Sequence, residues 1–399
     1  MNHFELLRAQ AKALSVPAPG EAAAAVSAAL ADVLRLEMAA QGGAIPFSRF
    51  MEQALYAPGL GYYSAGSTKL GEAGDFVTAP EISSLFSRSL ARQCEQVLRN
   101  TGGDVLEFGA GRGVMAADIL LELESHACLP ERYSILEVSA DLRERQRETL
   151  LAKVPHLLGR VQWLEVLPAE FTGVMIGNEV IDAMPVELFH VGADGVSALG
   201  VAADGERFSW CKLAAKPELE RWYQQLASEL DAPLPEGYVS EANLVQARWL
   251  SSVLGCLTQG VLLLIDYGFS RREYFLPERE TGTLMCHYRH HAHPDPLVLV
   301  GLQDLTAHVD FTALAEQALL EKSDVLGYTS QGHFLTACGI LELAEKLAVD
   351  TRSQLELAAE LKRLLMPYEM GEKFKLLAVG KNFDQPLLGF AMNDMRHRL

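Results

Sequence analysis

Short apolar runs alternate with helical segments through most of this 399-residue chain. The run at residues 104–108 contains Glu107 and turns at once through Gly109, Gly111 and Gly113. Residues 114–123 then carry apolar positions at helical spacing, so a strand, a tight turn and a helix N-terminus are predicted here. Because backbone without side chains can approach a ligand closely, this turn indicates a nucleotide-like ligand, with a plain structural turn as the alternative.

Further apolar runs of strand type predict a sheet. They lie at residues 133–138, 161–166, 173–176 and 261–265, with helical segments between them. Strands that alternate with helices predict right-handed crossovers and a parallel sheet that is buried on both faces. The tail adds strand candidates at 323–328 and 374–379 and helices at 332–347 and 353–365. The expected fold class is therefore α/β.

Two regions depart from this alternation. Residues 1–100 are mainly helical, with helices predicted over 21–41, 48–56 and 78–98, the last one starting with a capping box of Thr78 and Glu81. Residues of about 186–255 are predicted to form an inserted lid, with antiparallel strands over 186–213 and helix over 217–255. We expect an N-terminal helical region at 1–100 and an α/β domain at 101–399 that this insertion interrupts.

Composition and charge narrow the class of protein. Apolar residues make up 49% of the chain and charged residues 22%, which is typical of a globular protein without membrane insertion. The start shows no signal or transit peptide, and the six dispersed cysteines favour a reducing compartment over disulfides or zinc, so a cytoplasmic location is expected. A net charge of −18 disfavours nucleic acid and is compatible with a cationic acceptor.

The spacing of the glycines separates two kinds of nucleotide ligand. A dinucleotide fingerprint needs a third glycine at position 114, which is Val114, and this disfavours an NAD-dependent dehydrogenase. Alternating glycines preceded by an acid are instead the pattern of the S-adenosylmethionine site in Rossmann-like methyltransferases.

Acidic residues end the next two runs. Ligands of open α/β sheets bind beyond the carboxyl ends of the strands, so these residues are candidates. Glu137 can accept hydrogen bonds from both ribose hydroxyls of an adenosine-containing cofactor, or it can cap the helix at 139–151. Glu165 lies where the adenine ring is expected.

Three polar residues follow the run at 173–176: Asn178, Glu179 and Asp182. Methyl transfer requires that the acceptor be held in line and lose a proton. A carboxylate suits a guanidinium because its two oxygens match the planar fork. We expect these residues at the active-site edge, with capping of the next segment as the alternative.

The sequence leaves more than one role for each of three other clusters. Asp266 and Tyr267 end an apolar strand and either line the acceptor pocket or form a turn. The histidines of segment 286–293 lack carboxylates at ligand spacing, so a solvated or structural role is favoured over a substrate loop and over a metal, and no metal is expected. Segment 301–311 caps a helix or reaches the pocket, and the pattern does not choose.

Seven segments in chain order resemble the motifs of one family, the MidA-like S-adenosylmethionine-dependent methyltransferases. These are bacterial relatives of the mitochondrial complex I assembly methyltransferase. The segments are 74–83, 107–113, 137–139, 178–185, 266–268, 301–311 and 329–332, and the resemblance extends from about Ile45 onward. Ala110 and Val114 stand where proline and threonine are expected, and neither replacement removes a backbone contact.

The resemblance implies a class I methyltransferase fold, S-adenosylmethionine as the cofactor, and methylation of a protein arginine on a respiratory complex I subunit. It also implies that the loop from Gly74 to Thr78 closes over the cofactor. The expected cofactor site comprises Gly74, Asp75, Phe76, Thr78, Glu107, Gly109, Gly111, Gly113, Glu137, Val138 and Asn178. The expected catalytic residues are Asn178, Glu179, Asp182, Asp266 and Tyr267.

Three functions remain in competition. The first is a protein arginine methyltransferase, which the length of the insertion favours because a long insertion suits a large acceptor. The second is a small-molecule O- or N-methyltransferase. The third is a non-catalytic assembly factor that binds the cofactor.

Overall fold

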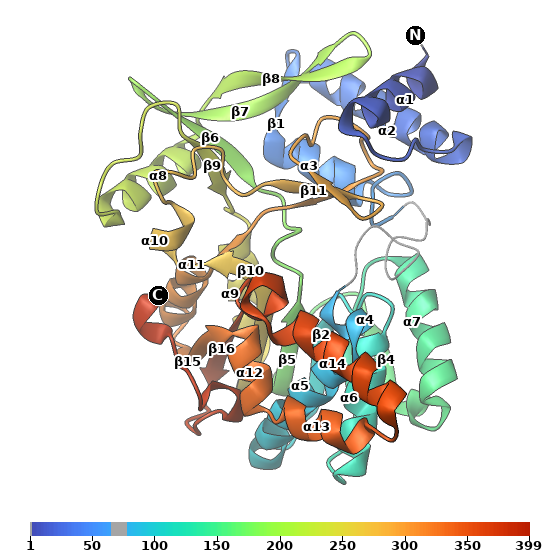
Figure 1. Ribbon diagram of the computed structural model, residues 1–399. Coiled ribbons are helices and arrows are strands. Elements are labelled where there is room, and N and C mark those ends of the chain that lie inside the picture. The colour runs from blue at the N-terminus through green and yellow to red at the C-terminus, as the bar shows by residue number, and fades with distance from the viewer. Residues whose placement is uncertain (1, 65–77) are drawn as a thin grey trace. The chain divides into compact units, whose positions relative to one another are not determined.

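A computed structural model describes residues 2–64 and 78–399 (Figure 1). The described residues fall into two compact units. The first comprises Met1–Phe76, Asp182–Gln246 and Arg272–His308, and the second comprises Val77–Ile181, Ala247–Arg271 and Val309–Leu399. The expected boundary at residue 100 does not coincide with this division, because the helix that ends at Thr101 packs within the second unit.

The second unit contains the larger sheet. Its strands are β2 (Asp104–Phe108), β3 (Tyr133–Leu136), β4 (Val161–Leu164), β5 (Phe171–Asn178), β10 (Leu257–Phe269), β14 (Val309–Asp310), β15 (Asp324–Ser330) and β16 (Phe374–Lys381). Its helices are α4 (Ala79–Ile82), α5 (Ser84–Thr101), α6 (Val114–Ser125), α7 (Ala140–Lys153), α9 (Gln246–Cys256), α11 (Phe311–Leu320), α12 (Gln331–Ala337), α13 (Ile340–Leu347) and α14 (Thr351–Leu365).

The strand order of this sheet is β15-β16-β10-β5-β2-β3-β4, and β14 also pairs with β10. Strands β4, β3, β2, β5 and β10 are parallel neighbours, in the 3-2-1-4-5 order of a doubly wound sheet. The prediction of a purely parallel sheet is wrong at one edge, because β16 runs antiparallel to both β10 and β15. The order reverses between β2 and β5, and ligands of such sheets bind at that point.

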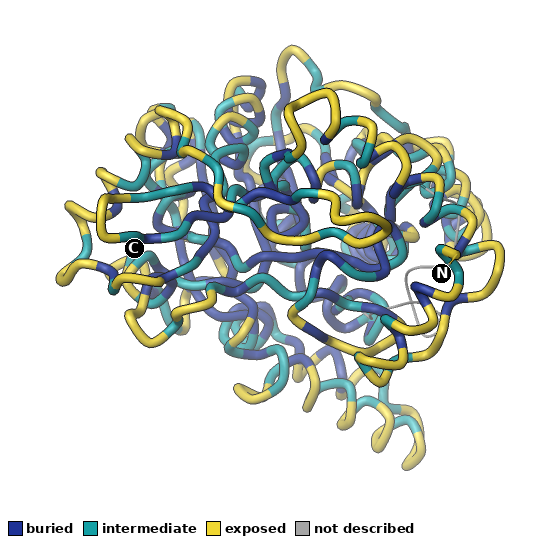
Figure 2. The backbone as a smooth tube through the Cα atoms, turned by 90° about the horizontal axis from the view of Figure 1, so that it is seen from above, coloured by how far each residue is buried: buried dark blue, intermediate teal, exposed yellow. Residues whose placement is uncertain are grey.

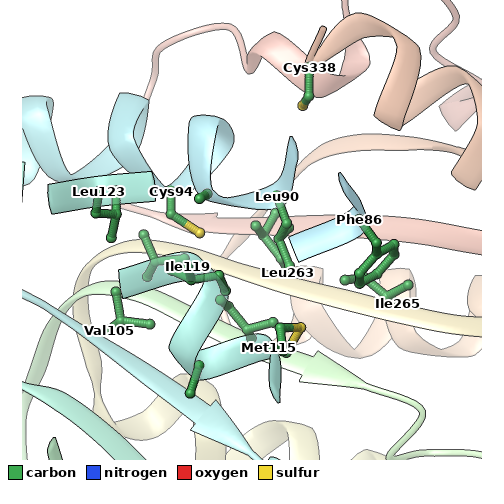
Figure 3. Packing of buried hydrophobic residues seen from close by; sticks show 14 of the residues in the cluster. Phe86, Leu90, Cys94, Val105, Met115, Ile119, Leu123, Leu263, Ile265 and Cys338 are labelled. Carbon is green, nitrogen blue, oxygen red and sulfur yellow. The ribbon is translucent and has the colours of Figure 1, made fainter. Parts of the chain in front are cut away.

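One face of this sheet is covered by a continuous apolar core. In this core, helices α5 and α6 pack on strands β2 and β10 (Figure 3). The residues involved are Phe86, Leu90 and Cys94 of α5, Met115, Ile119 and Leu123 of α6, Val105 of β2, and Leu263 and Ile265 of β10. The strands contribute alternate residues because side chains of a strand point to opposite faces. Figure 2 shows the buried stretches of the chain in dark blue. Strand β16 is buried from Phe374 through Gly380.

The first unit has two smaller sheets. Their strands are β1 (Ala44–Pro46), β6 (Glu187–Gly192), β7 (Gly195–Asp204), β8 (Arg207–Ala214) and β9 (Val239–Ala242) in one sheet, and β11 (Met285–Tyr288), β12 (His291–His293) and β13 (Asp304–Thr306) in the other. The helices are α1 (His3–Leu14), α2 (Glu21–Ala40), α3 (Phe47–Tyr56) and α8 (Pro217–Glu229), and α10 (Arg271–Tyr274) begins at the unit boundary. Because β1 pairs with β7, the N-terminal region and the expected insertion share a sheet.

Three helix predictions need correction. The helix predicted over 78–98 is interrupted by the extended residue Ser83, whose hydroxyl caps α5, and within the described residues Thr78 makes no side-chain cap. The helical stretch predicted over 217–255 contains strand β9, which pairs with β6. The helix predicted over 332–347 is broken at Gly339, whose φ is 79°. None of the described helices combines the length and apolar character needed to cross a membrane.

Candidate functional site

The carboxyl ends of five parallel strands line up at one edge of the larger sheet. Phe108 pairs with Leu136 and with Gly177, and these pair in turn with Leu164 and Leu264. The next residue along four of these strands is Gly109, Glu137, Glu165 or Asn178, each of them a candidate from the sequence. The strand register therefore brings residues from distant parts of the chain to the same edge.

The turn after β2 has the backbone conformation that its glycines predict. The φ angles are 61° at Gly109, 52° at Gly111 and 81° at Gly113, a region in which a Cβ atom is unfavourable. Gly109 is exposed, so its backbone is accessible at the strand end. The neighbouring Arg112 places Nη1 3.6 Å from Oε2 of Glu81, which links the turn to α4.

Glu107 is a fully buried carboxylate directly before the turn. The hydroxyl of Tyr133 donates to Oε2 at 2.7 Å, whereas Oε1 has no hydrogen-bond partner among the described residues. Burial raises the pKa of Glu107 to about 7; the hydrogen bond from Tyr133 opposes this effect and the charge of Glu137 adds to it. A buried carboxylate with one unsatisfied oxygen can bind a cationic or hydrogen-bond-donating group of a ligand.

Glu137 directly follows β3, and both of its carboxylate oxygens accept hydrogen bonds. Oε1 accepts a hydrogen bond from the backbone N–H of Ser139 at 2.9 Å, and Oε2 accepts one from Nε2 of Gln146 at 3.2 Å. Burial raises the pKa of Glu137, and these two hydrogen bonds lower it. The side chain that caps α7 is Ser139, which accepts from the N–H of Leu142. Val138 leaves 74% of its surface exposed at the same edge, which provides an apolar contact for a ligand.

Asn178 is the last residue of β5, and Glu179 begins the turn that follows it. Nδ2 of Asn178 donates to Oε1 of Glu179 at 3.1 Å, and Oδ1 of Asn178 is buried without a hydrogen-bond partner among the described residues. Glu179 has a φ of 52°, and its N–H donates to the carbonyl of Ile265 at 2.8 Å. A non-glycine residue in this region carries strain, and such strain is concentrated at functional sites.

The carboxylate of Asp266 accepts hydrogen bonds from two backbone N–H groups around this turn. Its Oδ2 accepts from the N–H of Ile181 at 3.0 Å, and its Oδ1 accepts from the N–H of Tyr267, also at 3.0 Å. The Tyr267 ring meets Phe374 edge to face with centroids 5.4 Å apart. This geometry connects the segment after β5 to β10 through a buried carboxylate.

The described structure does not place the other predicted residues at this sheet edge. Gly74, Asp75 and Phe76 are outside the described residues, and Thr78 directly precedes α4. Asp182 is the first residue of its segment in the other unit, where its carbonyl accepts from the N–H of Ala307 at 2.9 Å.

The remaining clusters lie in small elements. The histidine segment forms β11 and β12, and no metal-binding group of His, Cys, Asp or Glu is found in the part of the chain that the structure describes. Segment 301–311 contains β13 and β14, and Asp310 caps α11 through its carboxylate.

Sequence reasoning missed three side chains of the site. Gln146 and Trp163 support Glu137, and Tyr133 binds Glu107. A glutamine on a polar helix carries no distinguishing pattern. Tyr133 could have been found from the parallel register, because its neighbour on the same face, Ile135, pairs with Glu107.

These residues fit S-adenosylmethionine. Glu137 suits the ribose hydroxyls, and Val138 offers apolar surface for the adenine. The exposed backbone at Gly109 and the unsatisfied oxygen of Glu107 suit the amino-acid part with its ammonium group.

Comparisons with known proteins agree with this fit. The chain matches, over residues 89–329, a family described as "Putative S-adenosyl-L-methionine-dependent methyltransferase". It is similar to a "likely methyl transferase" from Burkholderia thailandensis whose crystal structure contains S-adenosyl-homocysteine, with 44% identity, a TM-score of 0.91, and coverage of 96% of this chain and 100% of that one.

Curated relatives are more distant. "Protein arginine methyltransferase NDUFAF7, mitochondrial" of Bos taurus is 29% identical over 373 residues, covering 84% of this chain and 80% of the relative. The Caenorhabditis elegans homolog is 28% identical over 367 residues, covering 84% and 83%. The family resemblance and the cofactor expected from the sequence are thereby confirmed. The chain belongs to the S-adenosyl-L-methionine-dependent methyltransferase family, has the α/β methyltransferase fold with a mixed sheet, and uses S-adenosylmethionine as its cofactor.

Proposed function

We propose that this protein transfers a methyl group from S-adenosylmethionine to an arginine side chain of a protein, on a sheet of the class I type. The names of the mitochondrial relatives support this acceptor. The position of Glu179 at the carboxyl end of β5, held in a left-handed backbone, is the observation that carries the proposal.

Glu179 has the chemistry that an arginine acceptor requires. A guanidinium has a pKa above about 12 and must lose a proton as its nitrogen is methylated. The carboxylate of Glu179 can accept two guanidinium N–H groups, orient the nitrogen and take up the proton. Asn178, hydrogen-bonded to Glu179, fixes the orientation of that carboxylate.

The cofactor supplies an electrophilic methyl group on its sulfonium. Glu137 would bind the ribose, Glu107 the ammonium group, and the turn from Gly109 to Gly113 the amino-acid backbone. When the acceptor N–C bond forms and the S–C bond breaks, the nitrogen proton passes to Glu179 and then to solvent. The methylated guanidinium keeps its own positive charge, the sulfur becomes a neutral thioether, and the charge of the sulfonium leaves with the released proton.

The other predicted residues keep supporting roles in the proposal. Asp266 holds the backbone that follows Glu179, and Tyr267 continues the same strand. The catalytic role expected for Asp182 stays a prediction. By the sequence resemblance, the protein acceptor is a subunit of respiratory complex I type.

Mass spectrometry tests the acceptor. Protein and metabolites from the source organism, with and without this chain, are compared after labelling with deuterated-methyl methionine. We expect at least one labelled arginine-containing peptide that is lost when the chain is absent. A methylated metabolite without such a peptide would establish the small-molecule alternative, and no lost product at all would favour a cofactor-binding assembly factor.

Complementation separates catalysis from binding. The strain that lacks the chain is supplied with wild type, Glu179→Gln or Glu170→Gln, the last an exposed acid at the opposite end of β5. We expect Glu170→Gln to restore the labelled peptide and Glu179→Gln not to restore it.

A further inference from the structure

The side chain of Gln146 joins two turns of the cofactor site. Gln146 lies in α7 and is fully buried. Its Nε2 donates to the carbonyl of Gly111 at 3.0 Å and to Oε2 of Glu137 at 3.2 Å. One amide group therefore uses both of its hydrogens to connect the turn after β2 with the acid that follows β3.

Trp163 of β4 fixes the orientation of this amide. The indole Nε1 donates to Oε1 of Gln146 at 2.9 Å. If the amide were rotated by half a turn, its oxygen would face two acceptors and its NH2 would face the indole N–H, so the network permits one orientation. The guanidinium carbon of Arg147 lies 4.8 Å from the centre of the Trp163 ring, so the guanidinium makes a cation–π contact with the indole.

Backbone packing reinforces the connection. A Cβ atom placed on Gly113 would lie 3.2 Å from Cα of Gln146, closer than ordinary van der Waals contact. The glycine turn and α7 thus approach each other closely at the same residue that carries the amide. A change in the position of Gln146 would be transmitted to both turns.

The hydrogen bonds to Glu137 leave a defined capacity for a ligand. A carboxylate offers about four lone-pair sites. Ser139 donates to Oε1 and Gln146 donates to Oε2, and the backbone of Val138 is a further donor to this carboxylate. The lone pairs that remain can accept a hydrogen bond from a ribose hydroxyl.

We propose that Gln146, oriented by Trp163, is a positioning residue that fixes the Glu137 carboxylate for the ribose hydroxyls and couples it to the Gly111 turn. This inference rests on the proposed ribose-binding role of Glu137. The sugar half and the amino-acid half of S-adenosylmethionine are then bound by one connected unit. Loss of the amide weakens the recognition of the ribose hydroxyls in particular.

The same contact acts on the ionisation of Glu137. Burial raises the pKa of this carboxyl, and the Gln146 amide is one of the donors that lower it. A protonated Glu137 would use one oxygen as a donor and would accept the ribose hydroxyls poorly. Gln146 therefore supports both the orientation and the charge state of the acid.

Isothermal titration calorimetry tests the inference with S-adenosylhomocysteine and its 2′-deoxy and 3′-deoxy analogues. The proteins are wild type, Gln146→Met, which keeps the length of the side chain, and Gln162→Met as the matched control. Gln162 also binds a neighbouring strand, through Ser134, but does not contact Glu137 or the glycine turn in the described structure.

In wild type we expect loss of a hydroxyl bound by Glu137 to weaken binding about tenfold, as for a lost hydrogen bond to a charged group. In Gln146→Met this penalty should fall below about threefold, whereas Gln162→Met should retain it, a coupling that a merely structural role would not produce. Equal penalties in wild type and Gln146→Met would overturn the inference and leave the ribose-binding role intact. No penalty in wild type would overturn both.

If Gln146→Met does not fold, a second variant still tests the inference. Trp163→Phe removes the indole donor and keeps an aromatic ring in place. We expect a smaller reduction of the hydroxyl penalty in the same direction, with circular dichroism unchanged. An unaltered penalty in the folded Trp163→Phe protein would contradict the role of Trp163 in orienting Gln146.

Discussion

The turns after β2 and β5, where the strand order of the larger sheet reverses, both contain left-handed backbone but differ in the residues that adopt it. After β2 the chain passes through left-handed conformations at Gly109, Gly111 and Gly113, with φ of 61°, 52° and 81°. After β5 it adopts the same region with a side chain present, since Glu179 has a φ of 52°. The first turn offers bare backbone, whereas the second keeps a carboxylate in a conformation that glycine would adopt more easily.

This difference indicates what each turn contributes. A residue with a Cβ atom in the left-handed region costs about 1–2 kcal/mol, a cost that the glycines avoid. The protein bears this cost at Glu179, where hydrogen bonds from its N–H to Ile265 and from Asn178 to its carboxylate hold the turn. The side chain of Glu179 is therefore central to the proposed chemistry, and backbone shape is central to the turn after β2.

Replacement of Glu179 by glutamine should produce the largest effect. The amide keeps the shape of the side chain but cannot take up the acceptor proton, so methyl transfer should fall by about 10²–10⁴-fold. The assay follows tritium transfer from labelled S-adenosylmethionine to protein in an extract that lacks this chain. Affinity for S-adenosylhomocysteine should change less than about threefold; a large loss of affinity would assign Glu179 to cofactor binding instead.

Replacement of Gly109 by alanine should break the backbone-based turn. The added Cβ would stand at the exposed strand end, and binding of S-adenosylhomocysteine should weaken by at least about tenfold, or about 1.4 kcal/mol. Gly205→Ala in the β7–β8 turn is the matched control, because Gly205 has a φ of 59° and open space around it. Calorimetry should find normal affinity in the control, and equal losses in both variants would indicate general destabilisation.

The pH dependence of cofactor binding should follow the ionisation of Glu107, the buried acid before the glycine turn. Burial raises the pKa of Glu107 to about 7, so the ionised form that binds an ammonium group is depleted as pH falls. Affinity for S-adenosylhomocysteine should be about tenfold lower at pH 6 than at pH 8, with protons released on binding near neutrality. Glu107→Gln should abolish this dependence, and a flat wild-type profile would exclude Glu107 from ligand binding.

Two further results follow from the same pKa. Tyr133→Phe removes the hydrogen bond that lowers the pKa of Glu107, so the binding transition should move to higher pH. In the unliganded protein the folded state holds more protons at Glu107 than the unfolded state does between pH 4.5 and about 7. This residue should therefore reduce the free energy of unfolding as pH rises through that window.

Replacement of Glu179 by glycine should have the smallest of these effects where stability is measured. Glycine relieves the left-handed strain but adds backbone entropy to the unfolded chain, so a net gain of about 0.5 kcal/mol is expected. Urea denaturation measures this change, and methyl transfer should be lost at the same time. A loss of more than about 1 kcal/mol would show that the carboxylate stabilises the fold.

The sequence predicted the parts of the fold that depend on local patterns. The strands around the glycine turn and helix α6 were found because their apolar spacing and glycines are local signals. The antiparallel placement of β16 was missed because strand direction at a sheet edge depends on tertiary packing. The pairing of β1 with β7 joins residues more than a hundred positions apart, and a single sequence carries no signal for it.

In the candidate site, too, the residues that local patterns mark were predictable and those that depend on tertiary packing were not. Gly109, Glu137 and Asn178 were predictable because each lies at or near the end of a strand pattern, and the structure places them along one sheet edge. Gln146 was not predictable, because its role depends on two turns and an indole that meet only in three dimensions. The strain at Glu179 was likewise invisible, since glutamate has no preference for that backbone region.

A crystal structure of the protein with S-adenosylhomocysteine tests the central claim most directly. We expect ribose hydroxyls within hydrogen-bond distance of Glu137, the amino-acid part against Gly109 to Gly113, and the sulfur directed toward Asn178 and Glu179. A ligand bound away from this edge of the sheet, or one whose ribose has no contact with Glu137, would contradict it.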